Sequence, residues 1–467
     1  MFRWLETSRP RKKLKKETTV NYQGKKVAYY TLGCRLNFAE TSTLAYRLEQ
    51  LGFQKVASNG EDRGEAALII VNTCAVTEQA TAKSRQQINK LISEHPTAYV
   101  VVTGCYAQIE PQQLAERVKG IDVIVGTEFK GDNILSLLGD LTKREETLLY
   151  RTEYKDIHTF HGGCSADDRT RHFLKVQDGC DYFCTYCTIP LARGRSRNAS
   201  IAELVRMAEE VVAKGGREIV LTGVNIGDFG RTTGETFFDL CRALDEVEGV
   251  ERYRIGSIEP NLITDEIIHW IASESKRFAP HFHIPLQAGS DEVLKLMRRR
   301  YDTSLFRHKI ELIRQIIPHA FIGVDVMAGM RGETSELFER SYEFLESLSV
   351  SQLHPFTYSE RNGTKALEIK PVVPGPERHE RTARLVALSE QKLHDFYRTQ
   401  FGQTRHVLWE QPALLRDGQY APMHGFTENY VRVERPYDPA LVNVCQEVVL
   451  GNEIKQTTQG PVLTLKN

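Results

Sequence analysis

The sequence predicts an α/β protein made of three successive parts: an N-terminal parallel α/β sheet domain, a central partial (β/α)6 barrel and a small C-terminal all-β barrel. The first part is predicted by short β-rich runs that alternate with helix-like stretches between residues 26 and 130. The second is predicted by strand-like runs that recur before helical segments from residue 172 onward. The third is predicted by short β-prone runs separated by Gly, Pro and Asp after residue 402.

Composition limits the classes of protein to which the chain can belong. With 467 residues, 41% of them hydrophobic, it can bury large cores and is expected to form roughly two to four domains. It carries 61 Lys and Arg against 61 Asp and Glu, which excludes a uniformly basic surface and leaves only local patches for nucleic acid. Met1 to Lys16 is basic without the apolar core of a signal peptide, and no apolar run approaches the roughly 20 residues that cross a bilayer. We therefore expect a cytoplasmic protein with no membrane partner, whose clustered cysteines serve metal binding or catalysis rather than disulfides.

The N-terminal part contains the β-rich runs VAYYT, ALIIV, AYVVV and DVIV, with helix-like stretches at residues 40–51 and 77–91 between them. This alternation is typical of a parallel sheet covered by helices. Residues 131–165 contain a short helical piece and then charged sequence without an apolar period, which predicts a linker. We expect residues 26–150 to form this domain with its linker, and the basic residues 1–25 to be disordered.

The barrel is expected within residues 166–400, where strand-like runs precede helical segments: HFLKVQ, EIVLTG, YRIGSI, FHIPL, FIGVDVM and QLHPFTY. Six such repeats predict an incomplete barrel rather than the full eight-fold one. A long helical stretch follows, in which Leu385, Leu388 and Phe396 are spaced to bury one face against the barrel. Residues 402–467 are expected to form the small β barrel.

Three cysteines lie together in the sequence VQDGCDYFCTYCTIP, where Cys180, Cys184 and Cys187 form a Cys-x3-Cys-x2-Cys pattern. The loop follows the first predicted barrel strand, so it lies at the carboxyl end of the strands, where barrel active sites are built. Three thiolates can hold three irons of a four-iron cluster and leave the fourth iron open for a substrate or cofactor. The alternative is a zinc site completed by His172 or a distant cysteine, although closed zinc sites usually show a second ligand pair and none follows in the sequence.

This loop resembles the signature of the radical S-adenosylmethionine (SAM) enzymes, which has the same spacing and an aromatic residue, here Tyr186, before the last cysteine. The resemblance implies that the open iron of a [4Fe-4S] cluster binds SAM and that an electron from the cluster cleaves SAM to a 5′-deoxyadenosyl radical. Further SAM contacts are expected at the ends of later strands, where Gly223 could let the backbone approach and Asn225, Glu259 and Gln287 could supply hydrogen bonds. Loop glycines and helix-capping polar residues are the alternative for each of these positions.

A second set of cysteines, Cys34, Cys74 and Cys105, is dispersed in the sequence. Each comes two or three residues after an N-terminal strand, in TLGCRLN, VNTCAVT and VTGCYAQ. Because the carboxyl ends of parallel strands share one edge of a sheet, we expect the three thiols to meet there. The alternative is burial as small hydrophobic residues. That ordinary role is expected for the remaining cysteines, Cys164, Cys241 and Cys445.

The three dispersed motifs are similar to the cysteine motifs of the methylthiotransferases, and VQDGCDYFCTYCTIPLARGRSR continues the likeness up to Asn198, which departs from it. With a tail that resembles the TRAM module, the resemblance covers residues 26–467 and implies a second [4Fe-4S] cluster on the N-terminal cysteines that carries or delivers sulfur. The motif TLGCRLNFAET resembles most the bacterial branch that acts on N6-threonylcarbamoyladenosine 37 of tRNA. The branches that act on N6-isopentenyladenosine 37 or on a ribosomal-protein aspartate are the alternatives.

The activity implied by this resemblance is insertion of a methylthio group at carbon 2 of the modified adenosine, with two molecules of SAM. One SAM methylates sulfur associated with the N-terminal cluster, and the other yields the radical that activates carbon 2. No side chain beyond the cluster ligands is expected to be catalytic. The implied partners are the tRNA anticodon loop, an electron donor such as flavodoxin or ferredoxin, and a sulfur source. The rival from another class is an iron-sulfur protein that binds tRNA without turnover.

Local basic and aromatic groups are the candidates for RNA contact. Arg193, Arg195 and Arg197 follow the cluster loop, and the arginines at 298–300 lie near the end of a predicted barrel helix, so either set could meet phosphates. In the tail, which is not basic, aromatic side chains could stack on unpaired bases. The alternatives are solvated arginines with counter-charges and aromatic residues of the core. The aromatic candidates are Trp409, Phe426 and Tyr430.

Overall fold

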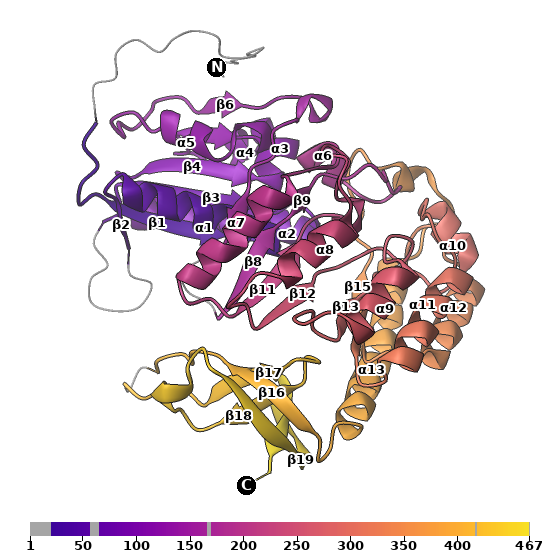
Figure 1. The fold of residues 1–467 in the computed structure, drawn as a ribbon. Helices are drawn as coiled ribbons and strands as arrows, with labels where there is room; N and C mark the ends of the chain where they lie inside the picture. The colour runs from indigo at the N-terminus through magenta and orange to yellow at the C-terminus, as the bar shows by residue number, and fades with distance from the viewer. Residues whose placement is uncertain (1–19, 57–64, 166–169, 416–417, 467) are drawn as a thin grey trace.

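The computed structural model describes residues 20–56, 65–165, 170–415 and 418–466. Figure 1 shows the three parts in chain order, with the N-terminal sheet and the C-terminal barrel on different sides of the central domain. The fold class predicted from the sequence is confirmed. The expectation of disorder for residues 1–25 falls mostly on residues that lie outside the described ones.

The N-terminal domain is a parallel sheet with the strand order β2-β1-β3-β4-β5-β6. Its central strands are runs of Val and Ile covered by helices on both faces, so every residue of β3 and β4 is buried. The strands are β1 (Lys26–Thr31), β2 (Gln54–Lys55), β3 (Leu68–Thr73), β4 (Tyr99–Gly104), β5 (Val123–Val125) and β6 (Leu148–Tyr150). The helices are α1 (Arg35–Gln50), α2 (Glu78–Glu94), α3 (Cys105–Ile109), α4 (Pro111–Arg117) and α5 (Asp132–Ser136).

Within the segment 131–165, which was predicted as a linker, two short strands pair with the flanking sheets. β6 pairs in parallel with β5 at the edge of the N-terminal sheet. β7 (Gly163–Cys164) pairs antiparallel with the first central strand. Strands of two or three residues are too short to show an alternating pattern, which is why the sequence did not reveal them.

The central domain is the incomplete parallel barrel. β8, β11 and β12 form one half, and β13, β14 and β15 form the other. Isolated bridges from β12 and the residues after it, Tyr253 with Phe278 and Ser257 with His283, join the halves. The strands are β8 (Arg171–Lys175), β11 (Glu218–Thr222), β12 (Arg252–Ile255), β13 (His281–His283), β14 (Phe321–Ala328) and β15 (Gln352–Thr357), with a ribbon of β9 (Gln177–Asp178) and β10 (Arg197–Asn198). The helices are α6 (Ile189–Arg193), α7 (Ile201–Ala213), α8 (Phe237–Asp245), α9 (Asp265–Ser273), α10 (Asp291–Leu296), α11 (Thr303–Ile316), α12 (Ser335–Ser347) and α13 (Gly375–Arg398).

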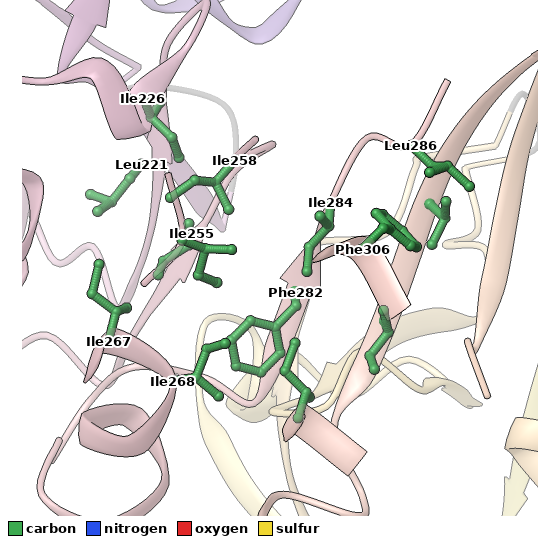
Figure 2. Packing of buried hydrophobic residues seen from close by; sticks show 14 of the residues in the cluster. Leu221, Ile226, Ile255, Ile258, Ile267, Ile268, Phe282, Ile284, Leu286 and Phe306 are labelled. Atoms are coloured by element: carbon green, nitrogen blue, oxygen red, sulfur yellow. The ribbon is translucent and has the colours of Figure 1, made fainter. Parts of the chain in front are cut away.

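Alternate strand residues of the barrel face two different environments. Side chains such as Leu221 and Ile255 point outward into the large apolar core beneath the helices, where Ile268 and Phe282 also pack (Figure 2). The intervening residues of the first two strands, including Phe173 of β8, face the lumen instead and contact Phe38 and Ala39 of α1. An N-terminal helix thus covers the open side of the barrel.

The C-terminal part is a closed barrel with the strand order β16-β17-β18-β20-β19. Its turn at 426–430 docks against the amino ends of the central strands, where Arg252 donates to the carbonyl of Phe426 at 2.7 Å and Arg254 to that of Thr427 at 2.7 Å. Helix α13 buries Leu385 and Leu388 against the central core, as predicted, whereas Phe396 packs in the C-terminal core instead. The strands are β16 (Thr404–Trp409), β17 (Met423–Thr427), β18 (Arg432–Arg435), β19 (Cys445–Thr457) and β20 (Gly460–Leu465).

Replacing Trp409, which is 0% exposed, should destabilise the C-terminal barrel. We expect Trp409→Ala to lower the free energy of unfolding of this barrel by about 3–5 kcal/mol, because it leaves a large cavity. The loss should be smaller for Trp409→Phe and smaller still for Tyr420→Ala, whose side chain is exposed. Chemical denaturation followed by circular dichroism measures the three losses, and an unchanged transition in Trp409→Ala would contradict the assignment of Trp409 to the core.

Candidate active site

The loop between β9 and α6 holds Cys180, Cys184 and Cys187 with their sulfurs in defined polar surroundings. The backbone N–H of Tyr182 donates to Sγ of Cys180 at 3.4 Å, and that of Ile189 donates to Sγ of Cys187 at 3.4 Å. Sγ of Cys184 accepts a hydrogen bond from Nη1 of Arg299 at 3.2 Å. Donors of this kind stabilise negative charge on sulfur, which suits cluster ligands.

The free thiols of this loop are poor acids. Burial raises the pKa of Cys180 to about 12, and burial together with the neighbouring Cys184 raises the pKa of Cys187 to about 12. Both therefore hold their protons at neutral pH, and binding of iron must displace those protons. Among the described residues, no three His, Cys, Asp or Glu side chains converge on a single metal ion.

Two of the predicted SAM contacts carry buried polar atoms without a partner. Asn225 is 3% exposed and neither its Oδ1 nor its Nδ2 has a partner among the described residues, and the same holds for Oε1 of Gln287. Such atoms need a ligand or water, so the site fits a polar cofactor. Glu259 is instead ion-paired with Arg299. Burial raises the pKa of Glu259, and Arg299 opposes the rise.

The other two predicted SAM residues, Gly223 and Tyr186, lie in packed surroundings. A Cβ at Gly223 would lie 2.6 Å from Ile226 and 3.1 Å from Oε1 of Gln177. That Oε1 accepts the backbone N–H of Asn225 at 2.9 Å, so the small residue lets the loop wrap around the amide that holds it. Tyr186 is half-buried against the central core.

The dispersed cysteines all lie at the carboxyl edge of the N-terminal sheet. Cys34 caps α1, Cys74 follows β3, and Cys105 begins α3. Burial and the neighbouring Cys105 raise the pKa of Cys74 to about 11, and Cys34 adds to the rise, so the three thiols lie within electrostatic reach of one another. Gly33 adopts a φ of +99°, and a Cβ there would lie 2.9 Å from Sγ of Cys74, so this approach requires glycine.

A buried ion network, defined here as Glu40, Lys130, Lys175, Asp178, Arg193 and Arg197, connects the two triplets. Glu40 of α1 accepts from Lys130 at 2.6 Å, Lys175 at 2.7 Å and Arg193 at 3.0 Å. Arg193, in the helix that follows Cys187, also donates to Oδ1 of Asn37 at 2.7 Å. Burial raises the pKa of Glu40, but the three cations hold it well below its usual range.

Asp178 supplies the second carboxylate of the network. It pairs with Lys175 at 2.7 Å, Arg193 at 2.9 Å and Arg197 at 3.2 Å. Two carboxylates therefore face four cations, and the excess positive charge lies beside the N-terminal triplet. Burial raises the pKa of Cys105, while Arg193 and Lys130 lower it. The network thus favours negative charge on the N-terminal sulfurs.

The basic RNA candidates differ in accessibility. Arg193 and Arg197 are 1% and 3% exposed and belong to the ion network, so they are not available to phosphates. Arg195 is exposed at the rim of the cluster loop, 3.5 Å from Asp181. In the second set, position 299 binds Cys184 and Glu259, whereas Arg298 and Arg300 are exposed.

The aromatic RNA candidates are structural. Trp409 lies in the C-terminal core and donates its Nε1–H to Gln446 at 2.9 Å. Tyr430 stacks on Phe426 with ring centroids 4.9 Å apart, and it also packs against His281 at 4.6 Å. Their burial excludes Trp409 as a base-stacking platform and assigns the other two rings to the joint between the C-terminal barrel and the central domain.

Several polar residues of the site were not predicted from the sequence. Lys175 and Asp178 occur in LKVQDGC, and charged residues in a buried strand were a signal that they are paired. In the lumen, Nε2 of His283 lies 2.7 Å from Oδ1 of Asp325, and the ring centroid of His354 lies 5.1 Å from that of His283. These three residues come from different strands, so no local sequence motif predicts that they lie together.

A three-cysteine loop at the carboxyl end of an incomplete parallel barrel defines a radical SAM protein. Residues 174–345 match the Radical SAM superfamily, and residues 26–126 match the Uncharacterized protein family UPF0004. The solved radical S-adenosylmethionine methyltransferase TsrM from Kitasatospora setae has the same fold, with a TM-score of 0.52 and 16% identity over 72% of this chain and 75% of that one. Membership of the superfamily implies SAM and a [4Fe-4S] cluster as cofactors.

Relatives that are similar to this chain over most of their length identify the family within the superfamily. The chain is 34% identical to the threonylcarbamoyladenosine tRNA methylthiotransferase MtaB of Bacillus subtilis, over 87% of this chain and 89% of that protein. It is 36% identical to the protein of the same name from Aquifex aeolicus, over 88% and 96%. It is 33% identical to the tRNA-2-methylthio-N(6)-dimethylallyladenosine synthase of Streptomyces coelicolor, over 83% and 77%. The chain belongs to the radical SAM methylthiotransferase family.

In the described parts of the chain, no helix combines the length and the apolar character required to span a bilayer.

Removing a carboxylate from the ion network should separate the two domains. We expect Glu40→Gln to cost about 3–5 kcal/mol of stability, because it leaves buried cations without their counter-charge. Thermal melting and limited proteolysis of the cluster-free protein measure the loss. Glu49→Gln, an exposed change on the same helix, is the matched control and should stay within about 0.5 kcal/mol.

The same network should make the domain joint sensitive to acid. The folded pKa values of Glu40 and Asp178 are held well below their usual range despite burial, which acts to raise them. Their stabilisation is therefore complete above the unfolded carboxyl pKa of about 4 and is lost as pH falls through the folded values. Equal acid sensitivity in wild type and Glu40→Gln would contradict this role.

Proposed function

We propose that the chain inserts a methylthio group at carbon 2 of N6-threonylcarbamoyladenosine 37 of tRNA. The observation that supports this most is the approach of two cysteine triplets, since Arg193 lies six residues after Cys187 and within electrostatic reach of Cys34 and Cys105. Identity of 33–36% to relatives named for this activity supports the choice of substrate.

Each triplet would hold one [4Fe-4S] cluster with an open iron, and the bound groups would supply the radical from SAM and the sulfur for transfer. The chain positions the reactants. Asn225 and Gln287 offer buried hydrogen-bonding atoms to SAM. The hydrogen bonds from Tyr182, Ile189 and Arg299 orient the barrel sulfurs. The ion network holds the N-terminal triplet at a fixed place beside the barrel and excludes water from the joint.

The remaining assignments belong to the same proposal. Residues 26–150 form the sulfur-delivering domain with its linker, 166–400 the radical domain and 402–467 a TRAM-like module. The tRNA substrate places the activity in the cytoplasm, where a flavodoxin or ferredoxin would supply electrons and a separate source would supply sulfur. Arg195, Arg298 and Arg300, which are exposed, would contact phosphates of the anticodon loop.

Analysis of tRNA nucleosides tests the substrate. Cells that lack this chain should accumulate N6-threonylcarbamoyladenosine without its 2-methylthio form, because the last modifying step is missing. Liquid chromatography with mass spectrometry measures both nucleosides, and complementation with the intact gene should restore the product. Loss of the methylthio form of N6-isopentenyladenosine instead would assign the chain to the other tRNA branch.

Separate removal of the two triplets tests the division of labour. Alanine at Cys34, Cys74 and Cys105 should lower iron and sulfide to about half if each cluster has four irons. This variant should still form 5′-deoxyadenosine but transfer no methylthio group. Alanine at the three barrel cysteines, 180, 184 and 187, should abolish 5′-deoxyadenosine formation. Full iron content with normal transfer in the N-terminal variant would show that its cysteines are ordinary buried residues.

A further inference from the structure

One arginine beside the candidate active site carries an unneutralised charge. Arg35 follows Cys34 directly, begins α1 and is exposed. Within the described part of the chain its guanidinium makes no ion pair and no hydrogen bond, and it lies over the ring of Phe173, 5.7 Å from the centroid. Two other arginines of the site, Arg193 and Arg299, are by contrast both paired with carboxylates.

The guanidinium of Arg35 faces the lumen of the barrel. Phe173 is a lumen residue, because its strand neighbour Leu174 belongs to the outer core. Burial lowers the pKa of His354 to about 4, with further lowering by His283 and by the charge of Arg35, so Arg35 is within electrostatic reach of this histidine on the far strand. The lumen therefore contains the guanidinium of Arg35, which no described residue pairs with, and the hydrogen-bonded pair of His283 and Asp325.

The chemistry of the substrate explains why a cation at this position is useful. Carbon 2 and the N6 substituent of adenine lie on the same six-membered ring, so a residue adjacent to the sulfur-delivering cysteines also lies adjacent to that substituent. The threonylcarbamoyl group ends in a carboxylate and a hydroxyl, whereas an isopentenyl group is apolar. A guanidinium binds a carboxylate with two parallel hydrogen bonds. Placing an apolar group against the same unpaired charge would cost desolvation without compensation.

We propose that Arg35 binds the carboxylate of the threonylcarbamoyl group and thereby selects the modified adenosine on which the enzyme acts. The inference rests on the proposed function and adds the residue that recognises the substrate. Asp325 carries negative charge in the same lumen, so the carboxylate lies on the α1 side and the hydroxyl and N–H groups lie toward the His283–Asp325 pair.

The test compares two anticodon stem-loop RNAs, one with N6-threonylcarbamoyladenosine and one with its carboxamide analogue, which lacks the negative charge. Wild type should bind the natural RNA more tightly than the analogue, measured by fluorescence anisotropy without SAM. Arg35→Gln should weaken binding of the natural RNA by about 10- to 100-fold and leave the analogue nearly unchanged. In turnover the effect should appear in KM more than in kcat. The matched control is Arg398→Gln, which removes an exposed arginine on α13 and should alter neither RNA.

Several outcomes would overturn the inference. Equal weakening of both RNAs by Arg35→Gln would show a general electrostatic contact, and unchanged binding of both would show no role in recognition. Iron content and 5′-deoxyadenosine formation without RNA report on the integrity of the clusters. If Arg35→Gln loses iron, binding of the same two RNAs is measured with Arg35→Lys. Lysine keeps the positive charge but cannot make the two parallel hydrogen bonds. Wild type that methylthiolates only isopentenyladenosine RNA would refute the proposed function itself, which is a separate result.

Discussion

The buried ion network between α1 and the cluster loop is the constraint on which the geometry of the site depends. Glu40 lies six residues after Cys34, and Arg193 lies six residues after Cys187, so each partner is tied closely to its own cysteine triplet. A charge pair enclosed from water tolerates little displacement, because any opening leaves both ions poorly solvated. The network therefore acts as a locating contact rather than as a source of net stability. Apolar packing alone between α1 and the barrel would permit sliding.

Buried ion pairs also join two domains at the opposite end of the barrel. Burial raises the pKa of Glu218, but Arg252 and Arg254 lower it to about 2, and the same two arginines donate to backbone carbonyls of the C-terminal barrel. An incomplete barrel cannot fill its lumen with the apolar layers of a closed one. Instead, charged residues on the inner face of the barrel bind the neighbouring domains. The ion network binds the N-terminal domain, and Arg252 and Arg254 bind the C-terminal barrel. The aromatic residues of the C-terminal turn lie at this joint.

The parts of the structure with local signals could be predicted from the sequence. Strand and helix periods gave the central strands, and equivalent positions after parallel strands brought Cys34, Cys74 and Cys105 together. The arginines after the cluster loop were ambiguous, because an RGRSR run looks the same whether it meets phosphate or buried carboxylates. Their partners, Glu40 and Asp178, lie on other elements, and only the tertiary fold shows the pairing. The edge strands β6 and β7 were missed because their backbone pairing leaves almost no side-chain pattern.

The arrangement also divides the chemistry between domains in a way that follows from the substrate. The solved radical SAM methyltransferase with 16% identity shares the fold of this chain. Sulfur delivery and recognition of the N6 substituent both act on one six-membered ring, so the groups responsible must approach it from the same side. Helix α1 begins immediately after Cys34 and covers the open side of the lumen. A residue at the start of this helix therefore lies next to Cys34 and at the open side of the lumen.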